Sequence, residues 1–174
     1  MLAYVRTLIN IALRKLGPED LPDSKFLLGL TLASYVLVDL PLTGMVFGPS
    51  IVLVQIVALD LGMLITCLWS LLSLTGHAAR FRQTLTALLG TSILLNLLIA
   101  PFSYWRQATV GMETQSVLPV IAIFSMVLWS LSINGHIISR ALSRTYSIGL
   151  VIAVIYFILN TFVLRSLLLT DSPG

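Results

Sequence analysis

The stretch Leu68-Trp69-Ser70-Leu71-Leu72-Ser73-Leu74-Thr75-Gly76-His77 returns, one residue shorter, as Leu128-Trp129-Ser130-Leu131-Ser132-Ile133-Asn134-Gly135-His136. Each copy ends an apolar run, precedes two arginines and leads into a new apolar run. Both new runs carry one asparagine, Asn96 or Asn160, after three apolar residues. Because self-similarity fixes an architecture before single residues are interpreted, the sequence predicts two tandem helical-hairpin repeats.

The composition is typical of a membrane protein. Hydrophobic residues make up 57% of the 174 residues and charged residues 10%, against roughly 45–50% and 25% in ordinary globular proteins. Apolar runs of about 20 residues recur, the length that a helix needs to cross a bilayer. These runs do not alternate in polarity as barrel strands do. The sequence therefore predicts an all-α integral membrane protein.

We expect two regions, a cytoplasmic segment over 1–25 and a single membrane domain over 26–174. Within the first, residues 2–16 predict an amphipathic helix, with Leu2, Val5, Ile9, Leu13 and Leu16 recurring at three- and four-residue spacing. Such a helix lies in the membrane interface with its basic face towards anionic head groups, or packs on the protein's own spans. Residues 19–25 then form a short solvated linker. Five spans follow, at about 26–45, 51–74, 84–102, 117–138 and 146–169.

The distribution of lysine and arginine predicts the orientation of the spans. Four of these residues lie in the N-terminal segment, and two follow each copy of the repeated stretch. Only Arg106 and Arg165 lie on the other side. By the positive-inside rule the N-terminus is cytoplasmic and the C-terminus lies outside. The two hairpins then run in the same direction, as parallel repeats related by an axis along the membrane normal.

Several function classes are disfavoured. The net charge of +3 comes from residues at span ends, where topology explains it, so we expect no nucleic acid. The lone cysteine, Cys67, excludes a disulfide framework and a cysteine-based zinc site. No phosphate-binding glycine loop, serine–histidine–acid arrangement or zinc-protease motif occurs. We therefore expect neither an enzyme nor a cofactor.

Two acidic residues inside the spans are the strongest candidates for function. Asp39 lies about four residues from the end of its span and Asp60 about nine residues into the next, depths of roughly 6 and 13 Å. A carboxylate there must protonate, find a donor or line a wet cavity. Gln55, level with Asp39, is a candidate donor to it, and Asn96, Asn160 and span hydroxyls are others. We favour a hydrogen-bond clamp between helices over a proton- or cation-binding site.

The two histidines, His77 and His136, are expected at helix ends, where the last carbonyls and the helix dipole favour a donor. The preceding Gly76 or Gly135 suits a helix end or a close backbone contact. We predict a repeated helix-capping device; the alternative is a metal or pH-responsive site between the histidines. We predict no metal, because two ligands without a nearby carboxylate or cysteine are a weak signal.

The loops that follow the two copies of the repeated stretch are basic. Their arginines can hold lipid phosphates, or they can reflect topology alone: Arg80, Arg82, Arg140 and Arg144.

The turn Thr75-Gly76-His77-Ala78-Ala79-Arg80-Phe81-Arg82-Gln83-Thr84-Leu85, a polar N-terminal stretch and five spans together resemble the Yip-type (Ypt/Rab-interacting) membrane proteins, in their bacterial branch. The resemblance covers roughly residues 25–168. Eukaryotic relatives bind Rab-type GTPases, but their N-terminal Asp-Leu-Tyr-Gly-Pro-like motif has no match here, so GTPase binding is not carried over. The resemblance implies a small multispan protein of the bacterial inner membrane.

These observations favour a non-enzymatic scaffold or accessory subunit that works through lateral contacts with another membrane protein or with itself. Small and hydroxylated residues support close approach of helices: Gly29, Ala33, Gly62, Ala87, Gly90, Ser125 and Gly149. The alternative is a small proton- or cation-linked transporter or channel that uses Asp39 and Asp60. A membrane-embedded enzyme ranks third.

The orientation can be tested by labelling in a background in which Cys67 is serine. A cysteine at Gln107 should react with an impermeant thiol reagent from outside, because positive-inside topology places it there. A cysteine at Ala79 should react only after the membrane is permeabilised. The reverse pattern would invert the orientation.

Overall fold

The computed structural model describes residues 2–47, 51–109 and 117–170, which are helical apart from short connections. The helices are α1 (Leu2–Ala12), α2 (Lys25–Phe47), α3 (Ile51–Leu74), α4 (Phe81–Ala108), α5 (Leu118–Ala141) and α6 (Tyr146–Thr170). Two 3-10 turns, η1 (Pro18–Asp20) and η2 (Ala78–Arg80), lie between them. Helices α2 to α6 are each long and apolar enough to cross a membrane. The expected all-helical class with five candidate spans is confirmed.

The helix bounds lie close to the bounds expected for the spans, except in α4 and α5. Helix α3 begins and ends where the sequence predicts. Helix α4, expected to end near residue 102, continues through Pro101 to Ala108. A proline inside a span removes one backbone hydrogen bond, which membrane helices tolerate. Helix α5 continues past Gly135 and His136 to Ala141. The second copy of the repeated stretch therefore does not end its helix, whereas the first copy does.

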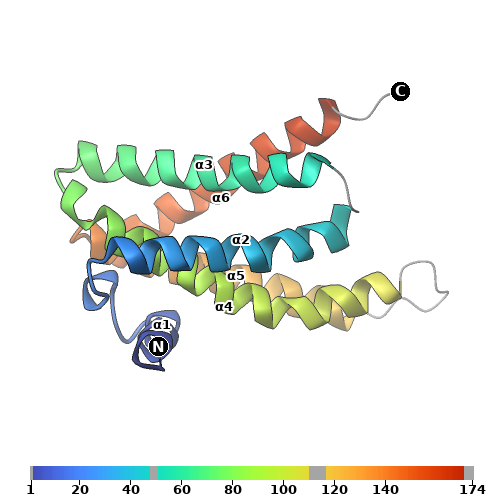
Figure 1. The fold of residues 1–174 in the computed structure, drawn as a ribbon, viewed down its shortest axis with the longest axis horizontal. Coiled ribbons are helices and arrows are strands. Elements are labelled where there is room, and N and C mark those ends of the chain that lie inside the picture. The colour runs from blue at the N-terminus through green and yellow to red at the C-terminus, as the bar shows by residue number, and fades with distance from the viewer. Residues whose placement is uncertain (1, 48–50, 110–116, 171–174) are drawn as a thin grey trace.

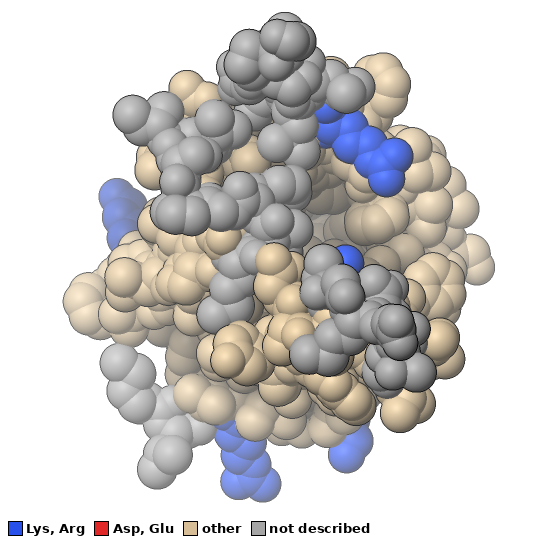
Figure 2. Space-filling model, turned by 90° about the vertical axis from the view of Figure 1, so that its right-hand side faces the viewer, with Lys and Arg blue, Asp and Glu red and all other residues tan. Residues whose placement is uncertain are grey.

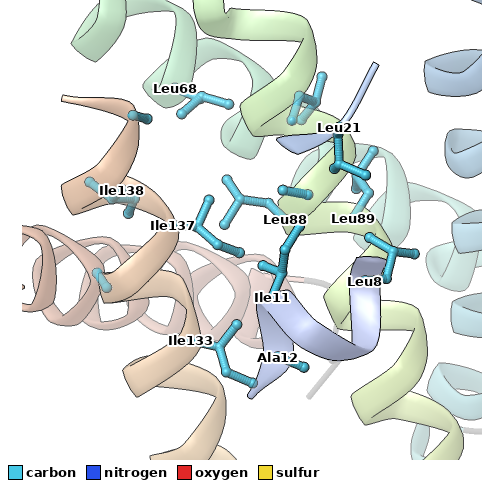
Figure 3. Packing of buried hydrophobic residues seen from close by; sticks show 14 of the residues in the cluster. Leu8, Ile11, Ala12, Leu21, Leu68, Leu88, Leu89, Ile133, Ile137 and Ile138 are labelled. Carbon is cyan, nitrogen blue, oxygen red and sulfur yellow. The ribbon is translucent and has the colours of Figure 1, made fainter. Parts of the chain in front are cut away.

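The hydrophobic core lies at one end of the bundle, which we call the turn end because the turns α3–α4 and α5–α6 lie there. Figure 3 shows α1 pressed against α4 and α5 in this region. The buried residues of the core come from all six helices and from the connection after α1, and include Leu8, Ile11, Leu21, Tyr35, Leu68, Leu88, Leu89, Ile133, Ile137 and Ala153. At the opposite end, the loop end, the helices spread apart (Figure 1). Figure 2 views the molecule from this end, which is hollowed near its centre.

Helix α4 is buried along one whole stretch, residues 84–91. Each of its three threonines there donates its hydroxyl, at 2.8 Å, to the backbone carbonyl four residues earlier. The threonines are Thr84, Thr86 and Thr91. This back-bonding satisfies the hydroxyls without a partner on another helix. The threonines therefore pack as small apolar residues, and neighbouring helices can enclose α4.

Helix α1 lies across the bundle and is seen nearly end-on in Figure 1. One face is buried on the spans, with Ile11 fully enclosed, and Tyr4 shares a 2.7 Å hydrogen bond with Thr31 of α2. Burial raises the pKa of the Tyr4 phenol, which keeps it neutral. Another face is apolar and open, since Val5, Ile9 and Leu13 are each 42–49% exposed.

The two hairpins differ in how closely their helices approach. Helices α5 and α6 form the most extensive pair in the described part of the chain. A methyl group added at Gly149 would collide with the carbonyl oxygen of Gly135 and lie 2.7 Å from the backbone nitrogen of Ser139. Helices α3 and α4 meet at far fewer places. Gly135 therefore serves a close helix contact, and the first hairpin has no equivalent of it.

Candidate functional site

A group of polar side chains from four spans forms the candidate site, which we call the polar cluster. It consists of Tyr35, Asp39, Thr43, Asp60, Asn96, Tyr156 and Asn160. Three members lie on one face of α2 at four-residue spacing, the period that places side chains on the same side of a helix. The remaining members come from α3, α4 and α6. The cluster therefore joins helices that are far apart in the sequence.

Asp39 links α2 to α4. The amide Nδ2 of Asn96 donates to Oδ1 of Asp39 at 3.1 Å, and the hydroxyl of Thr43 donates to Oδ2 at 3.4 Å. Both carboxylate oxygens thus accept a hydrogen bond. A polar group away from water costs free energy unless it is bonded in this way.

Asp60 links α3 to both α2 and α6. The phenol of Tyr35 donates to Oδ2 of Asp60 at 2.9 Å, and Nδ2 of Asn160 donates to Oδ1 at 2.5 Å. The same Nδ2 lies 3.2 Å from the hydroxyl of Tyr156. These hydrogen bonds connect α3 to the bundle in addition to its apolar contacts, in which Leu68 and Leu72 are buried in the core.

The donors differ from the sequence expectation in one respect. Gln55 is exposed, and among the described residues its amide makes no hydrogen bond to Asp39. Asn96 and Asn160 contact the carboxylates in its place. Sequence reasoning missed Tyr35 and Tyr156, although a signal was present: each tyrosine precedes a polar cluster residue by four positions, in Tyr35–Asp39 and Tyr156–Asn160.

A cavity of about 320 Å³ begins at the polar cluster and extends towards the turn end. Six polar residues line it: Tyr35, Asp60, Cys67, Ser92, Asn134 and Tyr156. The other lining side chains are all leucine, isoleucine or alanine. Asp39 and Asn96 do not line it. The two carboxylates therefore have different surroundings.

Arg80 caps the end of helix α5. Its guanidinium donates to the carbonyls of Arg140 and Ala141 at 3.2 and 3.0 Å and to the hydroxyl of Ser143 at 2.8 Å. A cation with several donors suits the last carbonyls of a helix and its negative dipole end. The capping that the sequence assigned to the histidines is carried out here by an arginine of the other hairpin.

His77 and Gly76 end helix α3 through their backbone. Gly76 adopts a positive φ of 76°, and the amides of Gly76 and His77 donate to the carbonyls of Ser73 and Leu72. This is the pattern of a Schellman C-cap, which requires the left-handed conformation that glycine adopts most readily. The Nδ1 atom of His77 is buried without a described hydrogen-bond partner.

His136 contacts the segment that follows α1. Its Nε2 donates to the carbonyl of Leu16 at 2.9 Å, since a carbonyl oxygen only accepts. Arg140 forms an ion pair with Glu19, and Arg82 makes two contacts of 2.7 Å with the carboxylate of Asp23.

The N-terminal linker thus contacts both turns, although most of its side chains are exposed, as expected of a solvated linker. Gln83 donates to the carbonyl of Leu21 at 2.7 Å, and Leu21 itself is only 2% exposed. Arg144 remains exposed beside Ser143, Arg140 and Glu19, at the rim of a surface depression. Among the described residues, no group of three potential metal ligands comes together.

Comparison with family models gave no match, and neither the curated proteins nor the solved structures gave a significant one.

The role of Asp60 can be tested by a double-mutant cycle with Asp60→Ala and Asn160→Ala, read from the free energy of unfolding. We expect a coupling energy of about 0.6 kcal/mol, and at most about 1.7, the range of hydrogen bonds between membrane helices. The matched cycle with Asn96→Ala should give a coupling near zero, because Asn96 bonds to Asp39. Equal coupling in both cycles would show that the paired contacts are assigned wrongly.

Proposed function

We propose that this chain is a non-enzymatic integral membrane scaffold or accessory subunit that acts through lateral helix contacts. The observation that carries the proposal is that each intramembrane carboxylate accepts hydrogen bonds on both oxygens from side chains of the protein. Such bonds link spans and stabilise their arrangement. The acids then have a structural task, as the clamp hypothesis requires.

Helix α2 offers a surface for a partner helix. Gly29 and Ala33, four residues apart, are exposed on one face, and nothing lies within 4 Å of a methyl group added at Gly29. Small residues at this spacing let a second helix approach closely. Leu37 continues the same face and is 74% exposed. The partner is another membrane protein or a second copy of this chain.

We further propose that the turn end faces the cytoplasm of a bacterial inner membrane and that the C-terminus lies outside. In this arrangement the open apolar face of α1, with Val5, Ile9 and Leu13, lies in the interface as an amphipathic helix. Arg144, exposed at the turn end, is placed to meet anionic lipid head groups. Arg80, Arg82 and Arg140 already bind protein groups.

The Yip-type resemblance and the tandem parallel repeat are also part of this proposal. Both hairpins consist of two spans joined by a short turn with arginines, as the repeat requires. The two hairpins share sequence features and topology, but their helices pack differently. Five candidate spans and the Gly76-His77 turn are compatible with the Yip-type arrangement.

The alternative, proton- or cation-linked transport, is favoured by one observation. Asp60 lines a cavity, and the ion pairs of the described residues, Arg82–Asp23 and Arg140–Glu19, both lie at the turn end. A charged group in a cavity inside a span is a frequent mark of an ion pathway. Asp39 accompanies Asp60 in this alternative.

The scaffold proposal predicts that a larger side chain on α2 prevents partner binding without unfolding the protein. The wild type, purified from native membranes in mild detergent, should carry a partner protein or self-associate. The Ala33→Leu variant should do neither, and its melting temperature should be unchanged. Ala58→Leu, which adds the same bulk at an exposed position of α3, should retain the partner.

Two results would contradict the scaffold proposal. One is a preparation in which wild type, Ala33→Leu and Ala58→Leu all remain single chains without a partner. The other is a flux driven by a pH gradient in proteoliposomes of the wild type that is absent with folded Asp60→Asn, which would establish transport instead.

A further inference from the structure

The cavity beside Asp60 has the size and lining of a small-molecule site. Its volume of about 320 Å³ falls within the range of roughly 300–1,000 Å³ found for ligand pockets. Along α3 it extends from Asp60 to Leu71, a length of about 16 Å at 1.5 Å per residue. It is therefore a narrow, mostly aliphatic space with its acid at one end, a shape that suits an alkyl chain with a polar head.

Asp60 retains the capacity to bind a ligand. A carboxylate offers about four acceptor positions, and the described contacts of Asp60 use two of them, for Tyr35 and Asn160. In both bonds Asp60 is the acceptor. The remaining positions can accept from a group in the cavity.

The charge of that group follows from what surrounds Asp60. Among the residues that line the cavity there is no lysine, arginine or histidine, and the ion pairs of the described chain lie at the turn end. The neighbouring acid, Asp39, contacts Asn96 and Thr43. An ionised carboxylate in an apolar setting is stabilised most by an opposite charge. A cationic head complements this site, and an anionic lipid phosphate does not.

We infer that the cavity binds an amphiphilic amine, with its protonated amino group on Asp60 and its alkyl body along α3 towards Leu71. This goes beyond the scaffold proposal and does not depend on it, because a partner on α2 and a ligand in the cavity use different surfaces. The chemical class is a primary amine that carries a medium-length hydrocarbon chain.

Cys67 provides a reporter within the cavity. It is the single cysteine of the chain, lines the cavity and follows Asp60 by seven residues, two helical turns along the same face. A bound ligand should shield its thiol. The reaction rate of Cys67 with N-ethylmaleimide therefore measures occupancy without an engineered label.

The test compares octylamine with octan-1-ol, which share the alkyl chain and differ in the charge of the head. With the wild-type protein in lipid nanodiscs, octylamine at ten times its Kd should slow alkylation of Cys67 about tenfold. Octan-1-ol at the same concentration should leave the rate nearly unchanged. Asp60→Asn should lose the protection by octylamine, whereas Asp39→Asn, outside the cavity, should keep it.

A control separates binding from a general effect on the bilayer. In the double variant Cys67→Ser, Leu74→Cys the only thiol lies on the same helix at a position that is 87% exposed, and octylamine should not change its rate. Equal protection by amine and alcohol, protection that persists in Asp60→Asn, or no protection would each overturn the inference. The amine–alcohol comparison needs no variant, so it decides the matter even if Asp60→Asn does not fold.

Discussion

A carboxylate inside an apolar span has no bulk water to bind, and this constraint explains much of the structure away from the turn end. Asp39 and Asp60 each accept hydrogen bonds on both oxygens, from side chains of α2, α4 and α6. These bonds lie farther from the turn end, beside buried apolar residues such as Val57 and Leu95. Hydrogen bonding at the polar cluster and apolar packing at the turn end thus stabilise different parts of one bundle.

The turn end depends on a different set of interactions. Helix α4 is enclosed because its threonines bond to their own backbone, and the N-terminal linker is bound to both turns through His136, Arg140 and Arg82. Exposed ion pairs of this kind contribute little individually. Combined with the burial of Ile11 and Leu21, they place α1 against the spans. This arrangement joins α1 and the linker to the spans at the turn end.

The sequence predicted what depends on local composition. The five candidate spans, the bounds of α3 and the presence of two acids within these helices follow from long apolar runs interrupted by rare polar residues. Contacts between distant residues could not be predicted, because periodicity does not show which helix faces a given side chain. Gln55 is level with Asp39 by counting, yet it is exposed. Likewise, Arg80 caps a helix that ends some sixty residues later, and Gly135 contacts Gly149 instead of ending a helix.

The central claim is that Asp60 connects α3 to the rest of the bundle, and a distance measurement tests it most directly. Spin labels at the exposed positions Val54 of α3 and Phe162 of α6, in a Cys67→Ser background, report the separation of these helices. The account predicts one narrow distance distribution that broadens in Asp60→Leu and stays narrow in Asp39→Leu, which removes only the link from α2 to α4. An unchanged narrow distribution in Asp60→Leu would contradict it.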